Sequence, residues 1–144
     1  MVRHEDTIRR HEDTVRTVVT TARTTIFAAV HFDPGHADIR SADQPLLDRK
    51  AALLVQNPNM RLRVFGYAND RGSDAKARQL GLDRALAVRT YLIAHGVDSA
   101  HVSVVSNGDA RLLCRSADSS CQSRNARDEF SIIAGGAEIT PDRD

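Results

Sequence analysis

The residues best suited to bind a charged ligand lie in one stretch, 64–92, which reads VFGYANDRGSDAKARQLGLDRALAVRTYL. An apolar alternating run is followed by a polar loop that contains Asn69, Asp70 and Gly72, and then by a long amphipathic pattern that contains Arg84. A strand, a loop and a helix in this order place hydrogen-bonding groups where a sheet ends and a helix begins. Amide and carboxylate acceptors combined with a guanidinium donor predict a ligand site rather than a catalytic one.

The sequence contains no arrangement typical of an enzyme. It has neither a Gly-x-Ser-x-Gly nucleophile motif nor a phosphate-binding loop. Arg84 with Asp70 would form an ion pair, not an acid/base couple. His4 and His11 lie seven positions apart but have no third ligand at a suitable spacing, so neither a metal site nor a cofactor is predicted.

Length and composition further narrow the class of protein. The 144 residues suit one compact domain with a tail, and 20 basic against 19 acidic residues leave a net charge of +1. This balance gives no broad field for nucleic acid or for an anionic membrane. No apolar run reaches the roughly 18 residues that a membrane span needs. The charged N-terminus excludes a secretory signal, so we expect any signal, anchor or barrel to belong to an upstream part of a parent protein.

Residues 3–16 contain a seven-residue repeat, RHEDTIR followed by RHEDTVR, with opposite charges spaced i,i+4. The repeat fits either a coiled-coil stalk that would make the protein a homodimer or a solvated linker helix. We favour the linker because the repeat is short and the following segment, 17–25, is rich in β-branched threonine. Residues 1–25 are therefore assigned to a helical linker or stalk, 26–135 to the domain and 136–144 to a disordered tail.

Along the domain, segments with the apolar periodicity of a strand alternate with segments that have the apolar periodicity of a helix. Apolar alternation predicts strands over 26–32, 60–65, 102–105 and 129–134, and helical spacing predicts helices over about 43–57 and 75–95. Gly96 is placed to end the second helix as a left-handed cap. In the first helix we expect Leu46, Leu47, Ala51, Leu54 and Val55 to face the core. The order β-α-β-α-β-β predicts an α/β two-layer sandwich, in which a mixed sheet carries its helices on one face.

Four separated segments in the right order resemble the OmpA-like C-terminal domain, the family of peptidoglycan-associated lipoprotein, outer-membrane porins and the flagellar protein MotB. They are FDPGHADIR, the 64–92 stretch, VSVVSNGDARLLC and NARDEF. The resemblance covers about residues 26–133. It implies a periplasmic domain, attached to the outer membrane or cell envelope, that binds the diaminopimelate of the peptidoglycan stem peptide noncovalently.

The resemblance also implies roles for individual residues. Arg84 matches the family arginine whose planar fork takes the ligand carboxylate. Asn69 stands where the family has an aspartate, so binding is expected to be weakened or altered, unless the neighbouring Asp70 supplies the charge. Asp33 matches a residue near the ligand but equally fits a turn residue before a proline. Arg127 is expected to organise the last loop through internal hydrogen bonds and to have only a secondary role in ligand binding.

Cys114 and Cys121 are the only cysteines, and they flank a polar loop. Their spacing is similar to that of a disulfide found in some members of the family, and a disulfide fits an oxidising periplasm. Two free thiols and half of a zinc site are the alternatives, and we favour the disulfide.

Two functions remain open from the sequence. The first is a module that anchors an envelope protein to the cell wall through Arg84, with Asn69, Asp70 and Asp33 around it. The second is a protein-interaction or scaffold domain of the same fold that no longer binds the wall. The first requires Arg84 to face an open cleft rather than to be held in internal contacts.

Overall fold

The computed structural model describes residues 22–68, 74–108, 121 and 124–135. One sheet has the strand order β1-β4-β2-β3, in which β2 and β3 are parallel and β4 is antiparallel to both of its neighbours. The strands are β1 (Val30–His31), β2 (Arg61–Tyr67), β3 (Val102–Gly108) and β4 (Arg127–Ala134).

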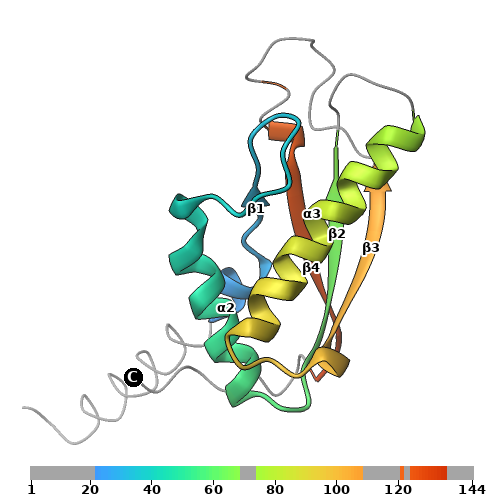
Figure 1. Cartoon of the computed structure of the whole chain (residues 1–144). Helices are drawn as coiled ribbons and strands as arrows, with labels where there is room; N and C mark the ends of the chain where they lie inside the picture. The colour runs from blue at the N-terminus through green and yellow to red at the C-terminus, as the bar shows by residue number, and fades with distance from the viewer. Residues whose placement is uncertain (1–21, 69–73, 109–120, 122–123, 136–144) are drawn as a thin grey trace, which may run out of the picture.

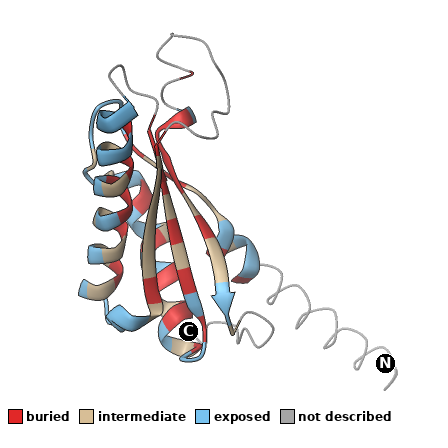
Figure 2. Ribbon diagram, turned by 90° about the vertical axis from the view of Figure 1, so that its right-hand side faces the viewer, coloured by how far each residue is buried: buried red, intermediate tan, exposed pale blue. Residues whose placement is uncertain are grey.

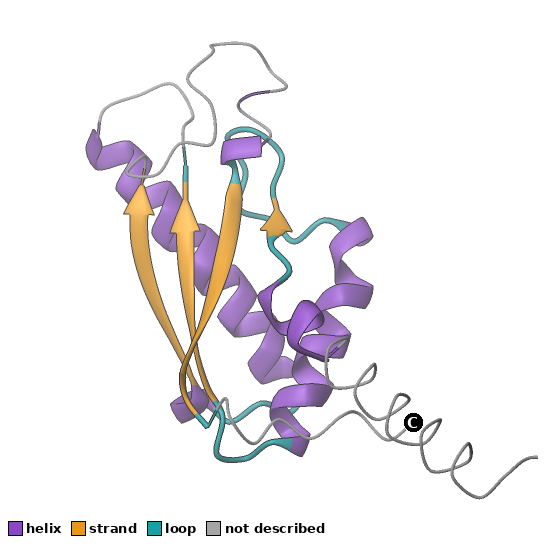
Figure 3. Ribbon diagram, turned by 180° about the vertical axis from the view of Figure 1, so that it is seen from behind, coloured by secondary structure: helices purple, strands orange, loops and turns teal. Residues whose placement is uncertain are grey.

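Helices α2 (Gln44–Gln56) and α3 (Asp74–Ala94) cover one face of the sheet (Figure 1). The short helices η1 (Ser41–Asp43) and η2 (Ser99–His101) precede α2 and β3. From behind, the strands lie in front of the helices (Figure 3), so the sheet and the helices form two layers. The predicted two-layer α/β sandwich with a mixed sheet is confirmed. Among the helices in the described segments, none combines the length and the apolar character that a membrane span requires.

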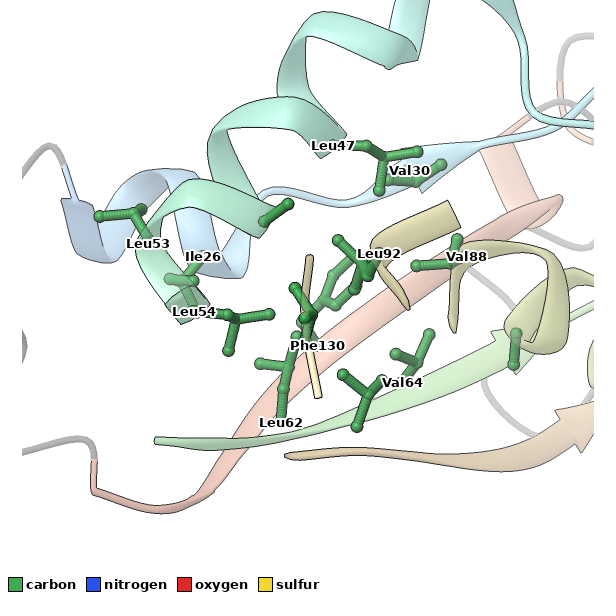
Figure 4. Packing of buried hydrophobic residues seen from close by; sticks show 14 of the residues in the cluster. Ile26, Val30, Leu47, Leu53, Leu54, Leu62, Val64, Val88, Leu92 and Phe130 are labelled. Atoms are coloured by element: carbon green, nitrogen blue, oxygen red, sulfur yellow. The ribbon is translucent and has the colours of Figure 1, made fainter. Parts of the chain in front are cut away.

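The core lies between the two layers. Figure 4 shows side chains of α2, α3, β2 and β4 meeting there, and Figure 2 shows α3 buried toward the sheet and exposed on its outer side. The prediction for α2 was wrong at Val55, which is 53% exposed, whereas Leu53 is buried. Gly96 has a φ of 99° and follows the last turn of α3, as predicted.

Helix α3 approaches β2 very closely where two glycines meet. A Cβ at Gly66 would collide with the carbonyl oxygen of Gly81, and a Cβ at Gly81 would lie 2.8 Å from the carbonyl oxygen of Gly66. Both positions therefore require glycine. Because Arg84 follows Gly81 by three residues on the same helix, this contact fixes the height of Arg84 above the sheet.

The first predicted strand was wrong at its start. Residues 22–27 are helical, and β1 begins only at Val30. The alternation nevertheless identified residues that face the core, because Ile26, Val30 and Phe32 are all buried. It failed only for the backbone conformation at Ile26, which is helical rather than extended. Short apolar runs with β-branched residues are ambiguous between helix and strand, and tertiary contacts decide the outcome.

One of those contacts comes from Lys50 of α2, which is fully buried. Its Nζ donates to the carbonyl oxygens of Thr25 and Ile26, both at 2.7 Å. The same nitrogen lies 3.8 Å from the ring centroid of Phe130. Lys50 therefore satisfies carbonyl groups at the C-terminal end of the 22–27 helix and ties that helix to α2 and β4.

Candidate functional site

The candidate site lies at the end of the sheet where β2 ends, β4 begins and the loop after β1 crosses toward α2 (Figure 1). Arg84 reaches this end from α3. Its side chain is fully buried, with no exposed surface. The site is therefore organised around a buried guanidinium.

Arg84 is bound by backbone carbonyl groups of two segments. Nε donates to the carbonyl oxygen of His36 at 2.8 Å, and Nη2 donates to that of Asp33 at 3.2 Å. Nη1 donates to the carbonyl oxygen of Tyr67 at 3.0 Å. The guanidinium also lies 5.5 Å from the ring centroid of Phe32. These are internal contacts, unlike the guanidinium facing an open cleft that the sequence-based hypothesis requires.

Asp33 is in the loop that Arg84 holds. Its carbonyl oxygen also accepts a hydrogen bond from the amide of His36 at 3.0 Å, which closes a turn in which Gly35 has a φ of 78°. Asp33 itself is exposed. The structure thus brings Asp33 and Arg84 together through the Asp33 backbone. Asn69 and Asp70 lie outside the described residues, so their predicted roles stay predictions.

Arg127 lies on the other face of the sheet, because its neighbour Asp128 faces α3 and successive strand residues alternate. Its guanidinium carbon is 4.0 Å from the ring centroid of Tyr67, and Nε donates to Oε2 of Glu129 at 2.9 Å. Nη1 donates to the carbonyl oxygen of Asn125 at 3.4 Å. These contacts hold together the end of β2 and the start of β4, which is an organising role.

Asp128 was missed by the sequence analysis. It is fully buried in β4, and neither of its carboxylate oxygens has a hydrogen-bond partner in the described part of the chain. Burial raises the pKa of Asp128 well above its usual value, and the positive charge of Arg84 opposes that rise. An available signal was its position two residues before Phe130, because alternate residues of a strand share a face.

The two cysteines are only partly described. Cys121 is fully buried, whereas Cys114 lies outside the described residues. Their pairing therefore stays a prediction. Among the described residues, no group of three or more histidine, cysteine or acidic side chains is arranged to hold a metal ion.

Comparison with known proteins matches most of the domain to one family. Residues 31–126 match the model of the OmpA family. The peptidoglycan-associated lipoprotein of Rhizobium meliloti (strain 1021) is 35% identical over 108 residues, which are 75% of this chain and 60% of that protein. The peptidoglycan-binding protein ArfA of Mycobacterium tuberculosis (strain H37Rv) is 29% identical over 72% of this chain and 32% of that protein. The chain thus spans less than two thirds of the length of these relatives.

Solved structures agree on the fold. The crystal structure of the peptidoglycan-associated lipoprotein from Burkholderia pseudomallei superposes with a TM-score of 0.70 at 28% identity, covering 72% of this chain and 88% of that one. The C-terminal domain of Helicobacter pylori MotB gives a TM-score of 0.63 at 21% identity, covering 73% and 83%. The latter likeness concerns the fold alone.

Proposed function

Because the chain belongs to the OmpA family, a peptidoglycan-binding and non-enzymatic family, we propose that it binds peptidoglycan noncovalently through the diaminopimelate of the stem peptide. The observation that carries this proposal is the family match over residues 31–126, together with relatives that are named for peptidoglycan association or binding. Arg84 is the residue that takes the ligand carboxylate in this proposal.

The chemistry of Arg84 supports that role. A guanidinium presents five donors in a planar fork, and it remains charged when buried. The hydrogen bonds given above fix the plane of the fork, because they hold Nε and both terminal nitrogens on carbonyl oxygens. These acceptors are dipoles, and in this proposal the positive charge of Arg84 attracts the carboxylate of the ligand. Since Arg84 has no exposed surface, the groups that cover it must move before a ligand reaches it.

The same burial favours the second candidate, a scaffold or protein-interaction domain in which Arg84 only joins the loop after β1 to the end of β2. The two candidates differ in one measurable property. A wall-binding domain is retained by isolated peptidoglycan, whereas a scaffold is not.

Sedimentation with purified diaminopimelate-type sacculi tests the proposal. We expect the wild type to sediment with the sacculi. A smaller fraction of the Arg84→Lys variant should sediment, because an ammonium cannot reproduce the bidentate fork of a guanidinium. Arg89→Ala is the matched control. Arg89 is on the same helix and also donates to carbonyl oxygens, of Val102 at 2.9 Å and Ser99 at 3.2 Å, but those residues lie at the other end of the sheet.

The outcomes separate the candidates. Absence of wild-type sedimentation would exclude wall binding and leave the scaffold. Equal sedimentation of wild type and Arg84→Lys would remove Arg84 from the site. Thermal unfolding of each variant shows whether a loss of sedimentation reflects the site or the fold.

We also propose that Asn69 weakens binding relative to an aspartate. A hydrogen bond that involves a charged group contributes about 1.5–3 kcal/mol, against about 0.5–1.5 kcal/mol for a neutral one. A difference near 1 kcal/mol corresponds to about a fivefold change in affinity. Asn69→Asp is therefore expected to sediment more tightly, and an unchanged affinity would place Asn69 outside the site.

The location of the chain follows from the same proposal. Peptidoglycan-associated lipoproteins are among its relatives, so we propose that it works in the periplasm as part of an envelope protein with a membrane anchor or barrel upstream. Self-association through the heptad of residues 3–16 stays a secondary proposal. Sedimentation equilibrium of the full chain against a variant that starts at residue 22 tests it.

A further inference from the structure

The feature that peptidoglycan binding through Arg84 leaves unexplained is the carboxylate of Asp128. Asp128 lies near the start of β4, an inner strand of the sheet, and its Cα pairs with those of Val30 in β1 and Gly66 in β2. The Cβ direction at Gly66 points at α3, because a Cβ there would collide with Gly81. Residues directly opposite each other on antiparallel strands share a face, so Asp128 also points toward α3.

Arg84 is on α3 and is bound at this end of the sheet. The positive charge of Arg84 acts on Asp128, although no hydrogen bond joins the two side chains. The two residues also share one short piece of β2. Arg84 donates to the carbonyl oxygen of Tyr67, and Asp128 pairs with Gly66, the residue before it. A cationic and an acidic side chain therefore lie at the same end of the sheet.

The carboxylate lacks partners of its own. Asp128 has no exposed surface, and both of its oxygens are without a hydrogen-bond partner in the described part of the chain. Buried polar groups are almost always hydrogen-bonded, so such an exception calls for a missing donor. Arg84 does not supply it, since its fork is turned to the carbonyl oxygens of Asp33, His36 and Tyr67.

We infer that Asp128 accepts the ammonium group of the same amino-acid head whose carboxylate Arg84 takes, and so determines the specificity of the site for a zwitterion. An ammonium is compact and carries three donors, which suits two unpartnered carboxylate oxygens. Its positive charge also favours the ionised form of Asp128, which burial alone disfavours. The inference rests on the proposed peptidoglycan binding and adds to it the residue that recognises the second charge. It also explains how a chain with a neutral Asn69 can still attract an ammonium.

The competing explanation is structural, with Asp128 only balancing the charge of Arg84. In that case its removal weakens every ligand of Arg84 by the same factor. If Asp128 instead binds an ammonium, its removal weakens only ligands that carry one. The ratio of two affinities therefore separates the explanations, because a general loss of folding or of Arg84 geometry cancels in the ratio.

The experiment compares meso-diaminopimelate with pimelate, which keeps both carboxylates but has no amino group. Affinities are measured by NMR titration of the full chain. We expect the wild type to prefer diaminopimelate by about tenfold or more, the size expected for a charge-assisted hydrogen bond. Asp128→Asn and Asp128→Val are both expected to lose this preference while still binding pimelate. Asp98→Asn is the matched control, since Asp98 is exposed and caps η2 by accepting from the amide of Ala100.

Two variants are used so that a folding defect in one does not decide the result. An unchanged preference in either folded Asp128 variant overturns the inference and leaves the proposed function standing. A wild type that binds diaminopimelate no better than pimelate also overturns it. Failure of the wild type to bind either compound, or sacculi, overturns the proposed function and the inference with it.

Discussion

Replacing Lys50 with methionine should change how the stability of the domain depends on pH. Burial lowers the pKa of Lys50 from 10.5 to about 7. The unfolded chain therefore keeps this proton up to about pH 10.5, whereas the folded chain releases it near pH 7. Between these values Lys50 binds more protons in the unfolded state, so its contribution to the free energy of unfolding rises with pH.

The size of the effect follows from the shift. One bound proton changes the free energy of unfolding by at most about 1.4 kcal/mol per pH unit. Between about pH 7.5 and 9 the wild type should thus gain about 2 kcal/mol relative to Lys50→Met. The two carbonyl acceptors and the Phe130 ring stabilise the protonated form, so a smaller gain means that they offset part of the burial.

Urea unfolding at a series of pH values measures this difference. Lys76→Met is the control, because it makes the same substitution at an exposed position of α3. We expect Lys76→Met to follow the wild-type pH dependence and Lys50→Met to show a flatter one. Parallel curves for the wild type and Lys50→Met would refute the reasoning, since they would mean that Lys50 keeps the same pKa folded and unfolded.

Three further predictions concern packing, the buried acid and the cysteines. Gly66→Ala forces a Cβ against the carbonyl of Gly81 and should lower the free energy of unfolding by about 3 kcal/mol in urea; a loss below about 1 kcal/mol would contradict the contact. Because the pKa of Asp128 is raised from 3.8, the folded state binds more protons than the unfolded state above that pH. The free energy of unfolding of the wild type should therefore fall with rising pH relative to that of Asp128→Asn, by up to about 1.4 kcal/mol per pH unit. Parallel dependences of the two unfolding free energies between about pH 4 and 6 would disprove this prediction. If Cys114 and Cys121 form a disulfide, thiol titration should find no free thiol before reduction, and reduction should cost about 2.5 kcal/mol of stability; thiols that react before reduction would exclude the bond.

The sequence predicted the elements whose periodicity is unambiguous. Strand β2 alternates cleanly and α3 keeps helical spacing over many turns, so both were found within a few residues of their observed bounds. The segment before β1 failed because IFAAVHF alternates in a way that a short helix also tolerates. Its helix is tied by Lys50 from α2, a contact between residues about 25 positions apart that local periodicity does not contain.

The site was predicted less completely than the fold. Resemblance predicted a role for Arg84 and for Asp33, and that role stays a prediction. The internal hydrogen bonds of Arg84 depend on how the loop that contains Asp33 crosses the end of β2. Two buried charges were overlooked although the pattern marked them. Lys50 follows Leu47 by three residues on the apolar face of α2, and Asp128 shares the face of Phe130 in β4. Charged residues on core-facing positions were the signal.

Two buried basic side chains of this domain are bound by backbone carbonyl oxygens, and this bears on function. Lys50 and Arg84 donate to backbone carbonyl oxygens. A carbonyl cradle satisfies the donors without cancelling the charge, whereas an ion pair to an acid would already neutralise it. Burial raises the pKa of Asp128 and the positive charge of Arg84 opposes that rise, but no hydrogen bond joins the two side chains. In the proposed site, a ligand with opposite charges on one carbon engages both groups once the segments that cover them move. An amino-acid head has this property, and a simple anion lacks it.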